Sequence, residues 1–226
     1  MSWEEKFKDI QEHLASWEFV KQLPPEAGPF KLLPGGERYG QHELLLFAYG
    51  NAQMHRRLNF IYTKETDDFV PVKEIGLNQF RDIRYFSRTR EDFEAQMQKV
   101  LPQLLQEMAP DYDAPCQYVL RKEGILTWDY LPKLPPKVGS FELFLKPDKP
   151  LRFINNAILI LDYSNFERGD QLVFSYNAAT NSYFAETKTR YIPNTIHDFD
   201  CKTLEQLADL LDKKLVPYLE KMEPAK

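Results

Sequence analysis

Two stretches of this chain read almost alike: residues 17–32 are WEFVKQLPPEAGPFKL and residues 128–143 are WDYLPKLPPKVGSFEL. They align without a gap at an offset of 111 residues, and seven of the 16 positions are identical. Average residue frequencies would produce about one such identity by chance. The shared positions include a tryptophan, a Pro-Pro pair and a glycine. Self-similarity of this kind predicts an internal repeat.

Two further matches follow in the same order. Residues 44–70 align with residues 158–184 at an offset of 114. The identical pairs are Leu45/Leu159, Tyr49/Tyr163, Asn51/Asn165, Leu58/Leu172, Phe60/Phe174, Tyr62/Tyr176 and Thr66/Thr180. A third match begins at Thr89 and Thr203. A generic helix–turn–strand pattern would explain one such block but not three in order, so we predict a tandem duplication, with units at residues 1–110 and 111–226.

Each unit is expected to begin with a helix and to continue into strands. Residues 2–20 carry Trp3, Phe7, Ile10, Leu14 and Trp17 at alternating spacings of four and three, which predicts one amphipathic helix that ends before the Pro-Pro pair. The matching helix of the second unit is expected at 115–126. Short strands should start at Phe30 and Phe141.

The apolar runs after these short strands are typical of β structure. Residues 44–49 and 158–163 are apolar at nearly every position, which predicts strands covered on both faces. Residues 58–62 and 172–176 place Leu, Phe and Tyr at alternate positions, on one face of a strand. A further strand is expected at 69–72 and at 183–186, and a variable segment follows it in each unit.

A second helix should close each unit. Thr89 and Thr203 are candidate N-caps, and apolar residues follow at helical spacing. Pro102 and Pro217 lie inside these helices, and we expect a bend there. The predicted fold is therefore α+β: a tandem duplication of an α-β(4-5)-α unit, with antiparallel sheets and helices packed on one face. The linker at 109–115 is short, so a pseudo-twofold pair is expected.

Composition excludes several classes of protein. The 226 residues are 43% hydrophobic and 14% aromatic, enough for a sizeable core and unlike a disordered chain. Residues 1–113 hold 14 Lys and Arg against 19 Asp and Glu, and residues 114–226 hold 15 of each, so neither half is basic as nucleic-acid binding would require. No apolar run is long enough to span a membrane, and the first residues lack a basic stretch followed by an apolar one, so no signal peptide is expected. Cys116 and Cys201 read as reduced thiols, so we predict a cytoplasmic protein.

Motifs for catalysis, nucleotides and metals are missing from the sequence. It contains no GxGxxG, GxxxxGK[ST], HExxH, GxSxG or EF-hand pattern. His197, Asp198, Asp200 and Cys201 are the closest approach to a metal cluster, but they fall within five residues, where a polar loop is favoured over zinc. We therefore predict no catalytic residue, no metal and no cofactor.

A few polar residues remain as candidates for binding. His55, Arg56 and Arg57 follow a predicted strand and could hold an anionic group, although a solvated loop is the simpler interpretation. Arg84 belongs to a second, sparse group of arginines that leads into a helix. Asn51 and Asn165 occupy the same place in the two units, where an asparagine usually satisfies a turn.

The shared residues are mostly apolar or turn-forming, whereas the differing residues are mostly polar and lie in loops. Function is therefore expected in the differing loops. We predict a non-catalytic binding or adaptor protein that presents two similar units to a protein partner or a small ligand, without nucleic acid or membrane as partner. The alternative is a hydrolase or transferase with its site in a cleft between the units, which would need converging ionisable groups.

Overall fold

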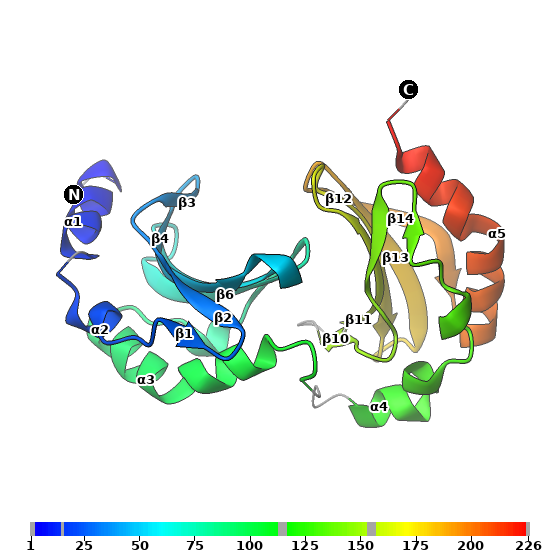
Figure 1. Ribbon diagram of the computed structural model, residues 1–226, viewed down its shortest axis with the longest axis horizontal. Coiled ribbons are helices and arrows are strands. Elements are labelled where there is room, and N and C mark those ends of the chain that lie inside the picture. The colour runs from blue at the N-terminus through cyan, green and yellow to red at the C-terminus, as the bar shows by residue number, and fades with distance from the viewer. Residues whose placement is uncertain (1–2, 15, 113–116, 153–156, 225–226) are drawn as a thin grey trace. The chain divides into compact units, whose positions relative to one another are not determined.

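A computed structural model describes residues 3–14, 16–112, 117–152 and 157–224. The chain divides into two compact units, residues 1–112 and 113–226. Each combines helices with one antiparallel sheet, as Figure 1 shows. The predicted mixture of α and β structure with antiparallel sheets is thus confirmed. No helix in the described ranges has the length and apolar character needed to cross a membrane.

The first unit is a meander between helices. Its elements are α1 (Trp3–Leu14), α2 (Glu18–Lys21), β1 (Glu26–Ala27), β2 (Phe30–Pro34), β3 (Arg38–Gly40), β4 (Glu43–Asn51), η1 (Ala52–Met54), β5 (Arg56–Thr63), β6 (Asp68–Ile75), β7 (Asn78–Arg81), η2 (Ile83–Tyr85) and α3 (Arg90–Glu107). The sheet has the order β1-β2-β4-β5-β6-β7, and β3 pairs with β4.

The second unit follows a closely similar order. Its elements are α4 (Gln117–Lys122), η3 (Ile125–Thr127), η4 (Leu131–Lys133), β8 (Lys137–Val138), β9 (Phe141–Leu145), β10 (Leu151–Arg152), β11 (Ala157–Asn165), β12 (Asp170–Asn177), β13 (Ser182–Thr189), β14 (Ile192–Cys201) and α5 (Leu204–Met222). Its sheet has the order β14-β13-β12-β11-β9-β8, and β10 pairs with β11.

Each sheet has seven strands, more than the four or five expected. The additional strands are mostly two to four residues long, too short for an alternating pattern to reveal them. β14 is the exception, with ten residues, and it includes residues 197–201, where the sequence favours a polar loop. It is an edge strand with mostly exposed side chains, so its polar composition resembles that of a loop.

The expected helix over residues 2–20 is instead two helices. α1 ends at Leu14 and α2 begins after Trp17, whose backbone is extended (φ −72°, ψ 102°). The Ser16 hydroxyl donates to the His13 carbonyl at 3.1 Å, a local bond that competes with helix continuation. The break allows the Trp17 ring to be buried. Ser2, the first residue of the helix expected over 2–20, and Pro115, the first residue of the helix expected at 115–126, lie outside the described residues.

Aromatic packing fixes α3 to the first sheet. The ring of Phe93, on α3, lies 6.4 Å from Phe47, 6.0 Å from Phe60 and 5.6 Å from Phe69 between centroids. Phe47 and Phe60 stack on neighbouring strands at 4.4 Å. The closing helix therefore covers the face of β4, β5 and β6 that carries these rings, as Figure 1 also shows.

In the second unit, the closing helix α5 packs on its sheet mainly through leucine side chains, whereas α3 packs through an aromatic ring. Leu207, Leu211, Leu215 and Leu219 repeat along one face of α5 and are buried in a cluster that contains Tyr163, Leu172, Phe174 and Tyr176. The predicted alternation of Leu172, Phe174 and Tyr176 on one strand face is confirmed, because all three join this cluster. Burial of such side chains contributes about 1.5–3 kcal/mol each.

Several contacts recur at matching positions of the two units. The Tyr49 hydroxyl donates to the Pro24 carbonyl at 2.7 Å, and the Tyr163 hydroxyl donates to the Pro135 carbonyl at 2.8 Å. Each bond ties a central strand to the Pro-Pro corner. The glycine after each corner has a left-handed backbone, with φ of 59° at Gly28 and 57° at Gly139. Such values favour glycine, which explains why both stretches carry it.

Candidate functional site

Arg56 and Arg57 are neighbours in β5, so their side chains point to opposite faces of the sheet. Arg56 Nη1 donates to the Met108 carbonyl, just past the end of α3, at 2.6 Å. Burial lowers the pKa of Arg56, and the charge of Asp111 opposes this shift. Arg57 Nη2 lies 3.9 Å from Glu37 Oε1, and its Nε is buried without a hydrogen-bond partner in the described part of the chain.

His55 contributes to the shape of the turn between β4 and β5. Its backbone is left-handed, with φ 49°. Its amide donates to the Ala52 carbonyl at 3.2 Å, and its carbonyl accepts from the Gly76 amide at 2.8 Å. These two backbone hydrogen bonds hold His55 in the turn and join the turn to the end of β6.

Asn51 and Asn165 make the same kind of contact in the two units. Asn51 Oδ1 accepts from the Met54 amide at 3.1 Å and its Nδ2 donates to the Pro29 carbonyl at 2.8 Å. Asn165 Oδ1 accepts from the Arg168 amide at 3.2 Å and its Nδ2 donates to Ser140 Oγ at 2.6 Å. Both side chains thus close a turn and bind it to the loop before the neighbouring strand.

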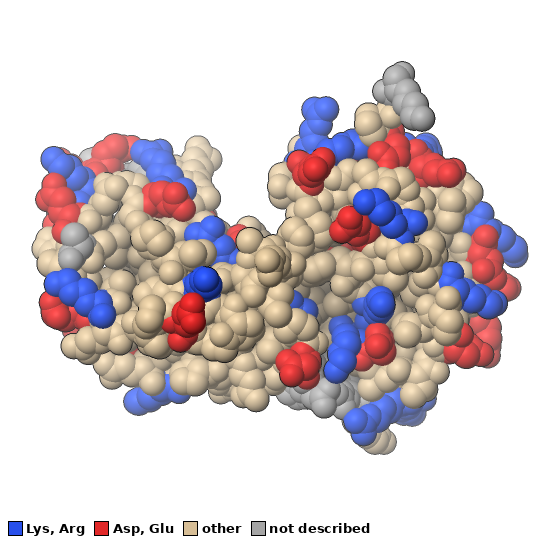
Figure 2. Space-filling view, viewed as in Figure 1, with Lys and Arg blue, Asp and Glu red and all other residues tan. Residues whose placement is uncertain are grey.

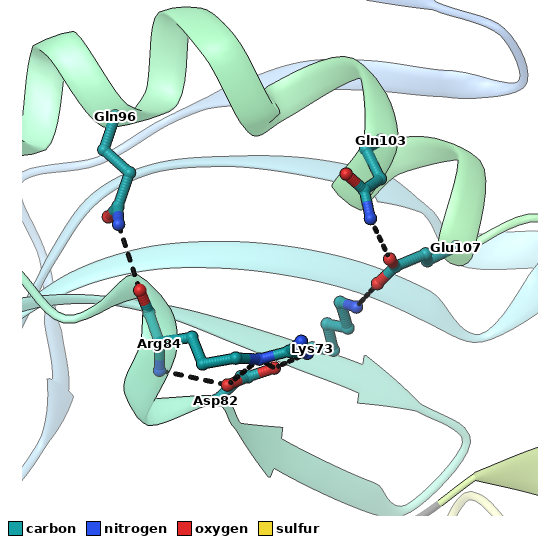
Figure 3. A network of polar contacts seen from close by, with 6 residues as sticks. All are labelled: Lys73, Asp82, Arg84, Gln96, Gln103 and Glu107. Carbon is teal, nitrogen blue, oxygen red and sulfur yellow. Dashed lines mark hydrogen bonds and ion pairs between the residues drawn. The ribbon is translucent and has the colours of Figure 1, made fainter. Parts of the chain in front are cut away.

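Arg84 lies in a network of polar contacts in the first unit (Figure 3). Its Nε donates to both carboxylate oxygens of Asp82 at 2.9 Å, and its Nη2 also contacts Asp82. The Arg84 guanidinium carbon lies 5.5 Å from the centre of the Tyr85 ring. The hydrogen bond from the Arg84 side chain is the main cause that lowers the pKa of Asp82, and burial opposes it. Arg84 is therefore a pre-ordered side chain that remains largely exposed.

The same network connects η2 and β6 to the closing helix. Figure 3 shows Gln96 and Gln103 projecting from α3 toward the sheet side. Gln96 Nε2 donates to the Arg84 carbonyl at 3.0 Å. Lys73 pairs with Glu107, which also accepts from Gln103 at 2.9 Å. Every carboxylate of this network is occupied by a cation or an amide, so the arrangement is suited to holding the segment in place.

The second sheet contains a buried polar cluster that was not predicted from the sequence. Asp162 Oδ1 accepts from Ser164 Oγ at 2.7 Å, and Asp162 Oδ2 accepts from Gln171 Nε2 at 2.5 Å. All three residues are fully buried. Burial lowers the pKa of Lys188, which pairs with Gln171 in the β12–β13 ladder, and the charge of Asp162 opposes this shift. The sequence does contain an indication of this cluster. Polar residues stand at positions 162 and 164 of an otherwise apolar strand, and a spacing of two places them on one face.

The residues considered for a metal lie in β14. His197 Nδ1 is 2.8 Å from Asp200 Oδ2, and the Asp198 carbonyl accepts from Lys214 at 2.7 Å. Burial is the main cause that raises the pKa of Cys201, to about 11, so this thiol is a weak ligand and nucleophile. Within the described ranges, no group of His, Cys, Asp and Glu side chains is placed to hold a metal ion.

The surface combines mixed charge with a few exposed apolar side chains. On the face shown in Figure 2, residues of both signs are interspersed over each unit. The large apolar side chains that are exposed in the described residues are Ile83 (79%), Tyr118 (79%), Ile192 (70%), Tyr191 (64%) and Val216 (41%). Three of these five lie between the last shared strand and the closing helix of a unit.

Comparison with known proteins offers no relative from which a function could be transferred: no protein-family model, curated protein or solved structure matches this chain.

Proposed function

We propose that this is a non-catalytic binding or adaptor protein, built from two similar units that arose by duplication, and that it contacts a partner through its two variable segments. We define these segments as residues 76–88 and 190–202. Each lies between a shared strand (β6 or β13) and the N-cap of the closing helix. The proposal includes a cytoplasmic location, since the chain carries few cysteines.

The recurring contacts support the duplication. The two tyrosine bonds to the Pro-Pro corners, the two asparagine turns and the two threonine caps fall at matching positions of the repeat. Sequence identity alone would not require the same hydrogen bonds. Superposition of residues 17–108 on residues 128–222 in an experimental structure tests this part, because a different order of elements would contradict it.

The variable segments are equal in length and unrelated in sequence. Both have 13 residues, and no position is identical when they are aligned at the offset of 114. The first forms β7 and η2, whereas the second forms the long edge strand β14. Segments that connect the elements of a fold vary more than the elements themselves and often carry binding residues.

The main observation in favour of the proposal is that these segments expose large apolar side chains. Ile83, Tyr191 and Ile192 expose most of their surface to solvent. Ile83 precedes Arg84, which Asp82 and Tyr85 hold in a fixed orientation. Tyrosine and arginine are enriched among residues that dominate binding energy at interfaces. A side chain ordered before binding loses less conformational entropy when a partner arrives.

Affinity capture on the immobilised full-length chain, followed by mass spectrometry of proteins and small molecules, tests the function. Two segment variants, Ile83→Ser and Tyr191→Ser, are compared with Val216→Ser and Tyr118→Ser, which remove exposed apolar side chains elsewhere. We expect a stoichiometric protein partner whose capture falls about tenfold or more in at least one segment variant, because burial of one large apolar side chain contributes at least about 1.5 kcal/mol. The controls should retain it.

Two outcomes would contradict the proposal. Equal capture by all four variants would place the binding surface outside the variable segments. A co-purifying metabolite without any protein partner would favour the alternative of a hydrolase or transferase.

A further inference from the structure

The N-terminal helix of the first unit is incompletely packed. Phe7, Ile10 and Leu14 form its apolar stripe, yet each is only half-buried, and none of its described side chains is fully buried. Gln11 Nε2 donates to the Gly36 carbonyl at 2.6 Å, and Arg38 lies over the Phe7 ring at 5.5 Å. These contacts hold α1 to the unit without covering its apolar face.

A hollow of about 260 Å³ opens beside this stripe. Its apolar wall consists of Ile10, Leu14, Trp17 and Phe69. Pockets for small molecules and cofactors usually enclose about 300–1,000 Å³, so this hollow is below their range. One large aliphatic or aromatic side chain is a better match for its size.

The second unit carries buried apolar residues at the corresponding distances before its own tryptophan. Leu120 and Ile125 lie eight and three residues before Trp128, and both are fully buried in the core. At the same distances before Trp17, the first unit has Asp9 and Leu14, and both line the hollow. The first unit thus lacks the apolar side chain that completes the second.

The rim of the hollow carries an excess of negative charge. Arg90 lies 3.6 Å from both Glu91 and Glu94, and its guanidinium lies 6.0 Å from the centre of the Trp17 ring. Glu94 also accepts from the Trp17 indole nitrogen. Asp9, 3.5 Å from His13 Nδ1, is the second carboxylate that lines the hollow, beside Glu91. Two carboxylates in a lining with one guanidinium favour a ligand with positive charge on either side of its apolar group.

We propose that this hollow is a docking site for a partner polypeptide segment that inserts one aliphatic or aromatic side chain flanked by lysine or arginine. The inserted side chain packs against Leu14, Trp17 and Phe69, and its basic neighbours approach Asp9 and Glu91. This site is separate from the variable segments, so failure here leaves the function proposed above untouched.

Titration of the full-length chain with short peptides, followed by the indole N–H signals in a ¹H–¹⁵N NMR spectrum, tests the proposal. The probe is acetyl-Lys-Leu-Lys-amide, with acetyl-Lys-Ser-Lys-amide and acetyl-Glu-Leu-Glu-amide as comparisons. Trp17→Phe assigns the reporter, and Trp128 serves as an internal control. We expect the Lys-Leu-Lys peptide to shift Trp17 but not Trp128. Affinity should fall about tenfold or more with serine and about fivefold with glutamate.

Two variants on the same helix distinguish binding in the hollow from a general effect of removing negative charge. Asp9→Leu places a leucine where the second unit has Leu120, so the hollow should fill and the Trp17 shift should disappear. Glu12→Leu makes the same change at an exposed residue outside the hollow. This variant should retain binding. A Trp17 signal that stays fixed at millimolar peptide, moves equally with all three peptides, or responds alike in both variants would overturn the proposal.

Discussion

In each unit, one arginine side chain binds a carbonyl at the end of the closing helix, although the two arginines are not at matching positions. Arg56 binds the Met108 carbonyl at 2.6 Å, and Arg168 binds the Met222 carbonyl at 3.4 Å. The two methionines match at the offset of 114, whereas the two arginines do not. The last carbonyls of a helix have no partner inside it, and a cation there also complements the helix dipole. The two units thus meet one physical requirement from different positions, the start of β5 in the first and the β11–β12 turn in the second.

Replacing Arg56 should destabilise the first unit. Arg56→Ala removes a charged donor from a half-buried carbonyl, and we expect a loss of about 1.5 kcal/mol in the free energy of unfolding. Urea denaturation followed by circular dichroism measures it. Arg57→Ala is the matched control, since Arg57 points to the opposite face, where its ion pair with Glu37 is long at 3.9 Å. Equal losses in the two variants would show that the Met108 contact is not the cause.

At the scale of elements, the starts of the two closing helices were predictable and the edge strands were not. Thr89 Oγ1 accepts from the Asp92 amide at 3.1 Å, and Thr203 Oγ1 accepts from the Gln206 amide at 3.2 Å, which confirms both predicted N-caps. An N-cap is a contact across three residues, so the sequence contains both partners. β14 has exposed residues and one proline, Pro193, which an edge strand tolerates because its nitrogen can face solvent.

Removal of a cap should cost about 1 kcal/mol. We expect Thr203→Ala to lower the free energy of unfolding of the second unit by this amount, because the Gln206 amide loses its acceptor. Thr203→Ser keeps the hydroxyl and should retain most of the stability. Thermal and urea unfolding of the three proteins measures the difference. If the serine variant lost as much as the alanine variant, the hydroxyl would not be the stabilising group.

At the scale of the whole molecule, each sheet is complete within its own unit. Every described strand pairs with strands of the same sheet. The largest described core cluster lies wholly within residues 113–226, and a second, formed by Leu45, Ala48, Ile61, Val70 and Val72, lies wholly within residues 1–112. A unit with its own core can in principle fold alone.

We therefore expect the fragments 1–112 and 113–226 to fold separately. Each should show one cooperative unfolding transition and a dispersed NMR spectrum, as a small single domain usually does. A fragment of residues 1–88 is the control: it keeps all seven strands of the first sheet but lacks α3, and loss of Phe93 leaves its ring cluster open. Cooperative folding of this control, or aggregation of both complete fragments, would contradict the argument.

The sequence by itself determined the features that depend on near neighbours and on simple periodicity: the central strands, both closing helices with their threonine caps, and the repeated pattern itself. It also predicted that Asn51 and Asn165 would close turns. These features can be predicted from the sequence because their physical causes act over a few residues. The causes are side-chain alternation, capping bonds and proline geometry.

Only the tertiary structure decided where the charged and isolated side chains go. Arg56 and Arg57 read as a pair in the sequence, but the alternation of β5 separates them, and Arg56 reaches a carbonyl 52 residues away in the chain. The hollow beside Trp17 is lined by Asp9, Leu14 and Phe69, which come from segments far apart in the chain. Such contacts join distant segments, and their energies depend on burial and distance, which arise only when the chain has folded.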